Sequence, residues 1–196
     1  MQVTGIILAG GKSSRMGYEK GLVELGGKTL MQIAIENLSS VCDRILISSN
    51  SKVFVDYDFE VIPDEIPDIG PMGGIYSALK RSETEANLVL SVDLPFVNPQ
   101  LFSYLIKSQD NYLAAVPYSG NDHYEPLCAC YSLKLLPFIA NRISIGIYKL
   151  PDLFREIAIN QLTINEELDF FHPSIFFNIN TPDDLISAEN MINSRS

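Results

Sequence analysis

A run of β-branched and leucine residues at positions 3–8 changes abruptly at Ala9 into a loop of small, glycine-rich and basic residues. The apolar run predicts a fully buried strand, and the change of composition marks its end. Gly10 and Gly11 lack Cβ atoms, so the chain can turn sharply there and bring backbone N–H groups close to an anion. The stretch 6–21 is therefore suited to cradling a nucleoside triphosphate.

Three basic residues follow this turn: Lys12, Arg15 and Lys20. The P-loop pattern (Gly-x-x-x-x-Gly-Lys-Ser/Thr) does not fit, because it leaves one residue fewer between its glycines than the chain has between Gly5 and Gly11. The dinucleotide fingerprint needs a Gly-x-Gly element, which the chain does not contain. Two alternatives remain: a different phosphate-binding pattern, or a glycine-rich strand-to-helix connection with solvated cations.

Composition limits the classes of protein and partner. A chain of 196 residues with 46% hydrophobic residues predicts one domain, residues 1–196, with a substantial core. A net charge of −10 argues against a nucleic-acid partner, which needs a broad basic surface. It leaves room for a nucleotide, because a few clustered cations and a divalent metal can neutralise a triphosphate.

We expect a cytoplasmic protein without a membrane partner. No apolar run approaches the roughly 20 residues that span a bilayer, and the first residues do not read as a signal peptide. Cys42, Cys128 and Cys130 then predict reduced thiols. Because the chain has only two histidines, Cys128 and Cys130 are better explained as core residues than as zinc ligands.

Short apolar runs alternate with segments of helical periodicity. This alternation predicts an α/β fold with three layers, in which helices cover both faces of a mainly parallel, Rossmann-like sheet and ligands bind at the carboxyl ends of the strands. The predicted strands are 3–8, 44–48, 60–62, 87–91, 113–116, 127–131, 157–162 and 176–178. The predicted helices are 30–38, 74–80, 99–107, 133–141, 147–155 and 182–192.

Acidic residues follow two of the predicted strands. Asp93 comes directly after the strand 87–91, and Pro95 prevents the strand from continuing, so the carboxylate projects from the carboxyl edge and is placed to hold Mg²⁺. Asp64 follows the strand 60–62 and could accept hydrogen bonds from a ribose or a base. Alternatively, Asp93 only caps a turn and has no role in binding.

Gly70, Gly73 and Gly74 permit a tight wrap around a flat group such as a base, although Gly-Pro segments commonly form plain turns. Glu125 precedes the strand 127–131 and either contacts a second substrate or is solvated. Asn178 and Asn180 share a face if their strand persists to residue 180, where they would support a metal or product. Alternatively, they only lead into the helix 182–192.

Taken together, these segments resemble the molybdenum cofactor guanylyltransferase family, which attaches GMP to molybdopterin. The similarity starts with Leu8-Ala9-Gly10-Gly11-x-x-x-Arg15-Met16-Gly17-x-x-Lys20, a pattern typical of nucleotidyltransferases. It continues in family order from end to end of the chain through 61–64, 70–75, 93–96, 125–127 and 178–185. Gly11 and the loop around Gly73 and Gly74 resemble guanylyl rather than cytidylyl members, so the resemblance favours GTP.

The resemblance implies a role for each of these residues, with nucleotide on the N-terminal half of the chain and acceptor on the C-terminal half. It places Mg²⁺ on Asp93 and implies that Arg15, Lys20 and Asp93 are catalytic. Ser48 stands where the family often has asparagine, and Asn50 lies two residues later, so which of them meets the nucleotide is open. The expected nucleotide-binding residues are Leu8, Ala9, Gly10, Gly11, Lys20, Ser48, Asp64, Gly70, Gly73, Gly74 and Asp93, and the expected acceptor-binding residues are Glu125, Asn178 and Asn180.

The implied reaction moves GMP from GTP to the phosphate of molybdopterin or Mo-molybdopterin and releases pyrophosphate. Cofactor-insertion proteins and apo-molybdoenzymes are the implied protein partners. One alternative is a related guanylyl- or cytidylyltransferase that acts on a sugar, polyol or other small phosphate. Another is a non-catalytic GTP-binding protein that delivers cofactor.

Overall fold

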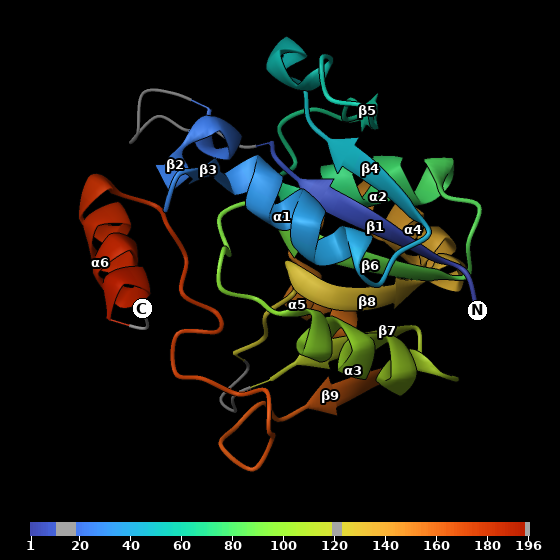
Figure 1. Cartoon of the computed structure of the whole chain (residues 1–196). Coiled ribbons are helices and arrows are strands. Elements are labelled where there is room, and N and C mark those ends of the chain that lie inside the picture. Colours follow the sequence, from blue (N-terminus) through green and yellow to red (C-terminus); the bar gives the residue numbers. More distant parts are fainter. Residues whose placement is uncertain (11–18, 119–122, 195–196) are drawn as a thin grey trace.

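The computed structural model describes residues 1–10, 19–118 and 123–194. Its centre is a seven-stranded sheet in the order β5-β4-β1-β6-β8-β7-β9 (Figure 1). The strands are β1 (Val3–Leu8), β4 (Arg44–Ser48), β5 (Glu60–Ile62), β6 (Ala86–Ser91), β7 (Ala114–Pro117), β8 (Cys128–Ser132) and β9 (Ile159–Leu162). The predicted mainly parallel α/β sheet is therefore confirmed, with β8 running antiparallel to both of its neighbours.

Helices cover both faces of this sheet (Figure 1). Alternate strand residues point to opposite faces, so Ile7 packs with the helices of one face and Ile6 with those of the other. The first face is covered by α1 (Leu30–Ser39) and α3 (Pro99–Gln109), and the second by α2 (Pro71–Arg81), α4 (Leu136–Ser144) and α5 (Leu150–Phe154). Among the described residues, no helix is long and apolar enough to cross a membrane.

A small hairpin and the last helix lie beside this core. The hairpin pairs β2 (Glu24–Leu25) with β3 (Lys28–Thr29), and α6 (Pro182–Asn193) packs against it. Single turns of 3-10 helix occupy Lys20–Leu22, Lys52–Phe54 and Leu133–Leu135. The hairpin strands are only two residues long, so their apolar alternation is too short to be recognised in the sequence.

The prediction of a strand at 176–178 is wrong. This segment leads into α6 without pairing to any described strand. Its backbone is tied to the neighbouring loop instead, since Ile179 donates its N–H to the carbonyl of Asp93 at 3.0 Å. Phe176 and Phe177 are partly buried against the core, so the apolar residues that resemble a strand serve to pack the segment instead.

Other element boundaries differ less. Helix α2 starts at Pro71 rather than at 74, because a proline is accepted in the first turn and Gly70 precedes it with a φ of +70°. The predicted helix 133–141 is a 3-10 turn followed by α4, which begins at Leu136. The predicted helix 147–155 is shortened to α5.

The three cysteines are free thiols, and Cys128 and Cys130 are buried in the core as predicted. Burial raises the pKa of Cys42 to about 12, and the carboxylate of Asp43 adds to the shift. Burial also raises the pKa of Cys130 to about 12 and that of Cys128 well above its usual range. The reactive thiolate is thus a negligible fraction of each residue at neutral pH.

We expect the native protein to resist alkylation by iodoacetamide at pH 8, because none of the three thiols ionises appreciably there. Mass spectrometry of the native and the urea-unfolded protein over the same interval checks this. Three added groups should be found after unfolding and almost none before it. Native alkylation of Cys42 at the rate of a free thiol would contradict the assignment.

Candidate functional site

The parallel strands end together at one edge of the sheet. In the strand register, Leu8 is paired with Ser48 on one side and with Ser91 on the other, and Ser48 is paired with Ile62. The last residues of four neighbouring strands therefore form one row. The loops that follow this row carry Ala9, Asp64 and Asp93, so residues 84 positions apart in the chain meet at one place.

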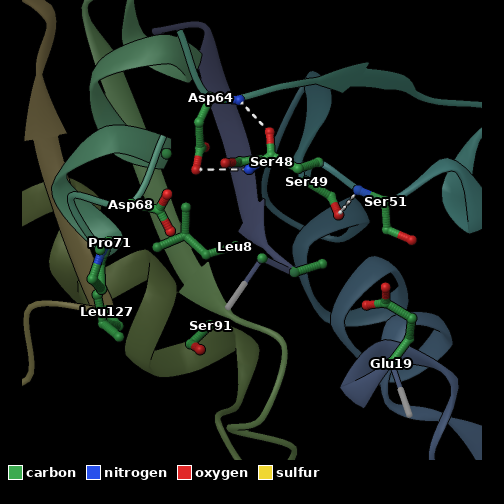
Figure 2. A pocket seen from close by; sticks show the side chains of 15 residues that line it. Leu8, Glu19, Ser48, Ser49, Ser51, Asp64, Asp68, Pro71, Ser91 and Leu127 are labelled. Carbon is green, nitrogen blue, oxygen red and sulfur yellow. Dashed lines mark hydrogen bonds between the residues drawn. The ribbon is translucent and has the colours of Figure 1, made fainter. Parts of the chain in front are cut away.

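A cavity of about 550 Å³ opens beyond this row (Figure 2). Figure 2 shows the labelled side chains of Leu8, Ser48, Asp64 and Ser91 around it. Most of the described residues predicted to bind nucleotide line it: Leu8, Ala9, Gly10, Ser48, Asp64, Gly70 and Gly74. Further lining residues, not predicted, are Glu19, Ser49, Ser51, Asp68, Pro71, Ser91 and Leu127, together with Asn50, the open alternative to Ser48.

Asn50 and Asp64 are joined by two hydrogen bonds at the cavity wall (Figure 2). The Asn50 amide donates its Nδ2 to Asp64 Oδ2 at 3.1 Å and accepts the Asp64 backbone N–H at 2.8 Å. Burial raises the pKa of Asp64, and the hydrogen bond from Asn50 partly offsets this. Asn50 thus orients Asp64, whereas Ser48 lies deeper, with 3% of its surface exposed. Both line the cavity, so which of them meets the nucleotide stays a prediction.

Gly73 and Gly74 are both buried in the first turns of α2, for different reasons. A Cβ on Gly74 would lie 2.6 Å from Ser48 Oγ and 3.5 Å from Asp64 Oδ1, so this glycine lets the helix approach the cavity wall. A Cβ on Gly73 would instead meet the carbonyl of Ile66 and the side chain of Ile69, both at 2.9 Å. Gly73 is absent from the cavity lining and serves packing of the preceding loop.

Lys20 and Asp93 form an ion pair beside the cavity, with Lys20 Nζ 2.6 Å from Asp93 Oδ2. The same Nζ donates to Asn180 Oδ1, also at 2.6 Å. Ser91 joins this pair to the cavity, because it lines the cavity and donates its Oγ to Asp93 Oδ1 at 2.6 Å. The sequence predicted the individual residues but gave no signal that Ser91 or Asn180 would contact them.

The donors around Asp93 suit a hard cation such as Mg²⁺. Among residues 1–10, 19–118 and 123–194, no group of three or more His, Cys, Asp or Glu side chains could hold a metal. A dedicated protein cage is not required, however, since Mg²⁺ is commonly bound by one or two carboxylates together with substrate phosphates. The Asp93 carboxylate, with the oxygens of Ser91 and Asn180 nearby, meets that requirement.

The strand that would give Asn178 and Asn180 a common face does not form. Glu125 lies near the end of β7, where its N–H donates to the carbonyl of Pro117 at 3.0 Å. Burial raises the pKa of Glu125, and His123, 3.4 Å from its Oε1, opposes this. Asn178 Oδ1 is buried without a hydrogen-bond partner among the described residues. Asn180 is exposed and contacts Lys20.

Gly11, Lys12 and Arg15 lie outside the residues that the structure describes. Their predicted contacts with phosphate stay predictions. The described part of the loop still shows where its ends are fixed: Ala9 donates its N–H to the carbonyl of Ser48 at 3.0 Å, and Lys20 is held by Asp93.

Comparison with known proteins identifies the family to which this chain belongs. Residues 5–157 match the family model described as the MobA-like NTP transferase domain. The chain belongs to this family. A probable molybdenum cofactor guanylyltransferase of Flavobacterium johnsoniae is 38% identical over 93% of this chain and 94% of its own length. One from Pyrococcus horikoshii is also 38% identical, over 94% of this chain and 98% of its own length.

A solved structure shows that the similarity also holds for the three-dimensional fold. The molybdopterin-guanine dinucleotide biosynthesis protein A of Archaeoglobus fulgidus superposes with a TM-score of 0.83 at 30% sequence identity. The match covers 97% of this chain and 99% of that protein. The nucleotidyltransferase fold predicted from the sequence is therefore confirmed.

We expect replacement of Asn50 by alanine to weaken nucleotide binding most at mildly acidic pH. Asn50 lowers the pKa of Asp64, so its removal should raise that pKa further and keep the carboxyl protonated to higher pH. An ionised carboxylate accepts hydrogen bonds at both oxygens, whereas protonation turns one of them into a donor, so GTP affinity should rise with pH and the rise should move to higher pH in the variant. Titration calorimetry at several pH values measures this.

The matched control is Ser51→Ala, a change at a neighbouring residue that also lines the cavity. Among the described contacts, Ser51 Oγ accepts only the backbone N–H of Val53 and does not touch Asp64. Its pH profile should coincide with that of the unmodified protein. A profile of Asn50→Ala that does not shift would show that Asp64 does not meet the nucleotide in its ionised form.

Proposed function

We propose that this protein transfers GMP from GTP to the terminal phosphate of molybdopterin, forming the guanine dinucleotide and releasing pyrophosphate. The proposal is carried by one observation: the cavity and the Lys20–Asp93 pair share Ser91, so a nucleoside site and a phosphate site adjoin at the same sheet edge. Membership of the MobA-like family, with relatives named as guanylyltransferases, supports the choice of reaction.

The nucleoside of GTP is proposed to occupy the cavity. Its volume of about 550 Å³ lies within the usual range for small-molecule sites. The Asp64 carboxylate, oriented by Asn50, would accept hydrogen bonds from the base or ribose. Gly70 and Gly74 would let the backbone approach the flat base, since neither presents a Cβ to it.

The phosphates are proposed to extend from Gly10 toward Lys20. The Lys20 ammonium has three N–H donors, and the described structure uses two of them, for Asp93 and Asn180. A third donor is therefore left for a phosphate oxygen. Gly11 and Arg15 are proposed to complete this site, as the family pattern implies.

Mg²⁺ is proposed to be held by Asp93 and to neutralise part of the triphosphate charge when bound. The carboxylate of Asp93 is well prepared for this, because Ser91 fixes one oxygen and Ile179 binds its backbone carbonyl. Lys20 Nζ lies 2.6 Å from the other carboxylate oxygen, so a metal on Asp93 would share this carboxylate with the ammonium. These residues hold charged groups in position rather than exchange protons with them.

The chemistry needs no protein base. The phosphate monoester of the acceptor has a second pKa of about 6 and is largely ionised at neutral pH. Its oxygen would attack the α-phosphorus of GTP in line, so that a new P–O bond forms while the bond to the β-phosphate oxygen breaks. Lys20 and Arg15 would stabilise negative charge on the departing pyrophosphate. Positioning and electrostatics then account for catalysis.

The acceptor is proposed to bind on the C-terminal half of the chain, near Glu125, Asn178 and Asn180. Of these, Asn180 is supported most directly, because it contacts Lys20. The buried and unpaired Asn178 Oδ1 offers an acceptor that a ligand or water could satisfy. Cofactor-insertion proteins and apo-molybdoenzymes would receive the product.

Incubation with GTP, Mg²⁺ and molybdopterin should yield the guanine dinucleotide, detected by mass, and one equivalent of pyrophosphate. CTP should give little product, and sugar or polyol phosphates should not replace molybdopterin. Asp93→Ala should abolish turnover while leaving the circular dichroism spectrum unchanged, because its carboxylate, although buried, lies in the loop after β6 and bonds to the side chains of Ser91 and Lys20 rather than to a helix or strand backbone. GTP binding without any pyrophosphate release would instead support a cofactor-delivery role.

A further inference from the structure

We propose that Asp184, in the first turn of α6, is a positioning residue that holds Asn180 against Lys20 and thereby fixes the Lys20 ammonium beside Asp93. The inference rests on the proposed function in one respect, which is that Lys20 meets the phosphates of GTP. It assigns a role to a residue that does not line the cavity and that has not been given one so far.

Lys20 is fixed by two acceptors rather than one. Its Nζ lies 2.6 Å from Asp93 Oδ2 and 2.6 Å from Asn180 Oδ1. A lysine ammonium is a point charge on a flexible four-carbon stem, so one acceptor alone leaves it free to swing around that contact. The second acceptor removes this freedom. Asn180 thus contributes, together with Asp93, to deciding where the ammonium lies.

Asn180 itself needs support, because it is exposed and lies outside regular secondary structure. Asp184 supplies it: Asp184 Oδ2 accepts the backbone N–H of Asn180 at 2.9 Å and that of Thr181 at 2.8 Å. The bond to Thr181 is the ordinary capping box of α6. The bond to Asn180 goes one residue beyond the cap and is not needed to satisfy the helix.

Helix α6, which carries Asp184, is fixed to the rest of the protein by two contacts. Ala188 is fully buried, and Glu189 Oε1 accepts the backbone N–H of Gly26 at 3.0 Å. Gly26 lies in the turn of the β2–β3 hairpin, a few residues after Lys20 in the chain. The hairpin that follows Lys20 and the helix that follows Asn180 therefore pack against each other.

The neighbouring Asp183 provides a matched control. It lies in the same first turn of α6 and carries the same charge near the helix N-terminus. In the described structure its carboxylate accepts no bond from the backbone of Asn180 or Thr181, in contrast to Asp184. Asp183→Ala and Asp184→Ala thus remove the same charge, and only the second removes the support of Asn180.

The test compares Asp184→Ala with Asp183→Ala for kcat by pyrophosphate release and for GTP affinity by calorimetry. Asp184→Ala should lower kcat about tenfold and weaken GTP binding severalfold, since small displacements of positioning groups have effects of this size or larger. Asp184→Asn should recover part of the loss, because its amide oxygen can still accept a hydrogen bond. Asp183→Ala should stay within about twofold of the unmodified protein.

A double-mutant cycle with Asn180→Ala separates positioning from stability. If Asp184 acts through Asn180, Asp184→Ala should change kcat and GTP affinity little once Asn180 is alanine. The melting temperature should fall in both backgrounds, because the helix cap is lost in both. Independent, multiplicative effects on kcat and affinity would overturn the inference, as would values for Asp184→Ala within twofold of the unmodified protein.

The two proposals fail in different ways. If the unmodified protein binds GTP but makes no guanine dinucleotide, the proposed reaction is wrong, and the cycle is read from GTP affinity alone. If the reaction proceeds and the cycle shows no coupling between Asp184 and Asn180, the reaction stands and the positioning role is wrong.

Discussion

The parallel pairing of β1 with β4 and β6 is the constraint on which the site depends. Parallel strands in register end at the same edge, and here the register places Leu8 between Ser48 and Ser91. A slip of one residue in this pairing would turn every side chain of β1 to the opposite face and would move Leu8 out of the row. The buried residues on both faces of β1 resist such a slip, so the core holds the site in register.

The site also resolves an apparent conflict between the acidic chain and its anionic substrate. A net charge of −10 repels a triphosphate at long range. At the site, however, Lys20 neutralises Asp93 across a 2.6 Å ion pair. Local charge near the phosphates is therefore less negative than the composition suggests, and bound metal reduces it further.

Much of the fold could be predicted because its signals are local. The strands β1, β4 and β5 end where the sequence predicts, since each apolar run stops at Gly, Ser or Pro. Asp64 could be placed near the site for the same reason. The segment 176–178 resembles a strand in sequence because burial against a loop gives the same apolar pattern as pairing in a sheet.

The parts of the site that sequence reasoning missed depend on contacts between distant segments. Nothing around Asn180 indicates that it meets Lys20, which is 160 positions away. Ser91 resembles an ordinary strand end, and its bond to Asp93 follows only from the backbone turn after β6. Asn50 and Asp64 belong to different strands, and the two bonds between them require the loops after β4 and β5 to approach each other.

The antiparallel strand β8 begins at the edge of the sheet where the site lies. Because β8 runs opposite to β6, the edge where β6 ends is the edge where β8 begins, and Leu127 enters the cavity there. Asp93 cannot extend β6, so its backbone carbonyl is left to accept the N–H of Ile179. The chain thus closes the site with a loop held by one backbone bond and by the cap of α6. A contact made this way can be set by a single carboxylate, which is why the start of α6, far from the cavity in sequence, matters to Lys20.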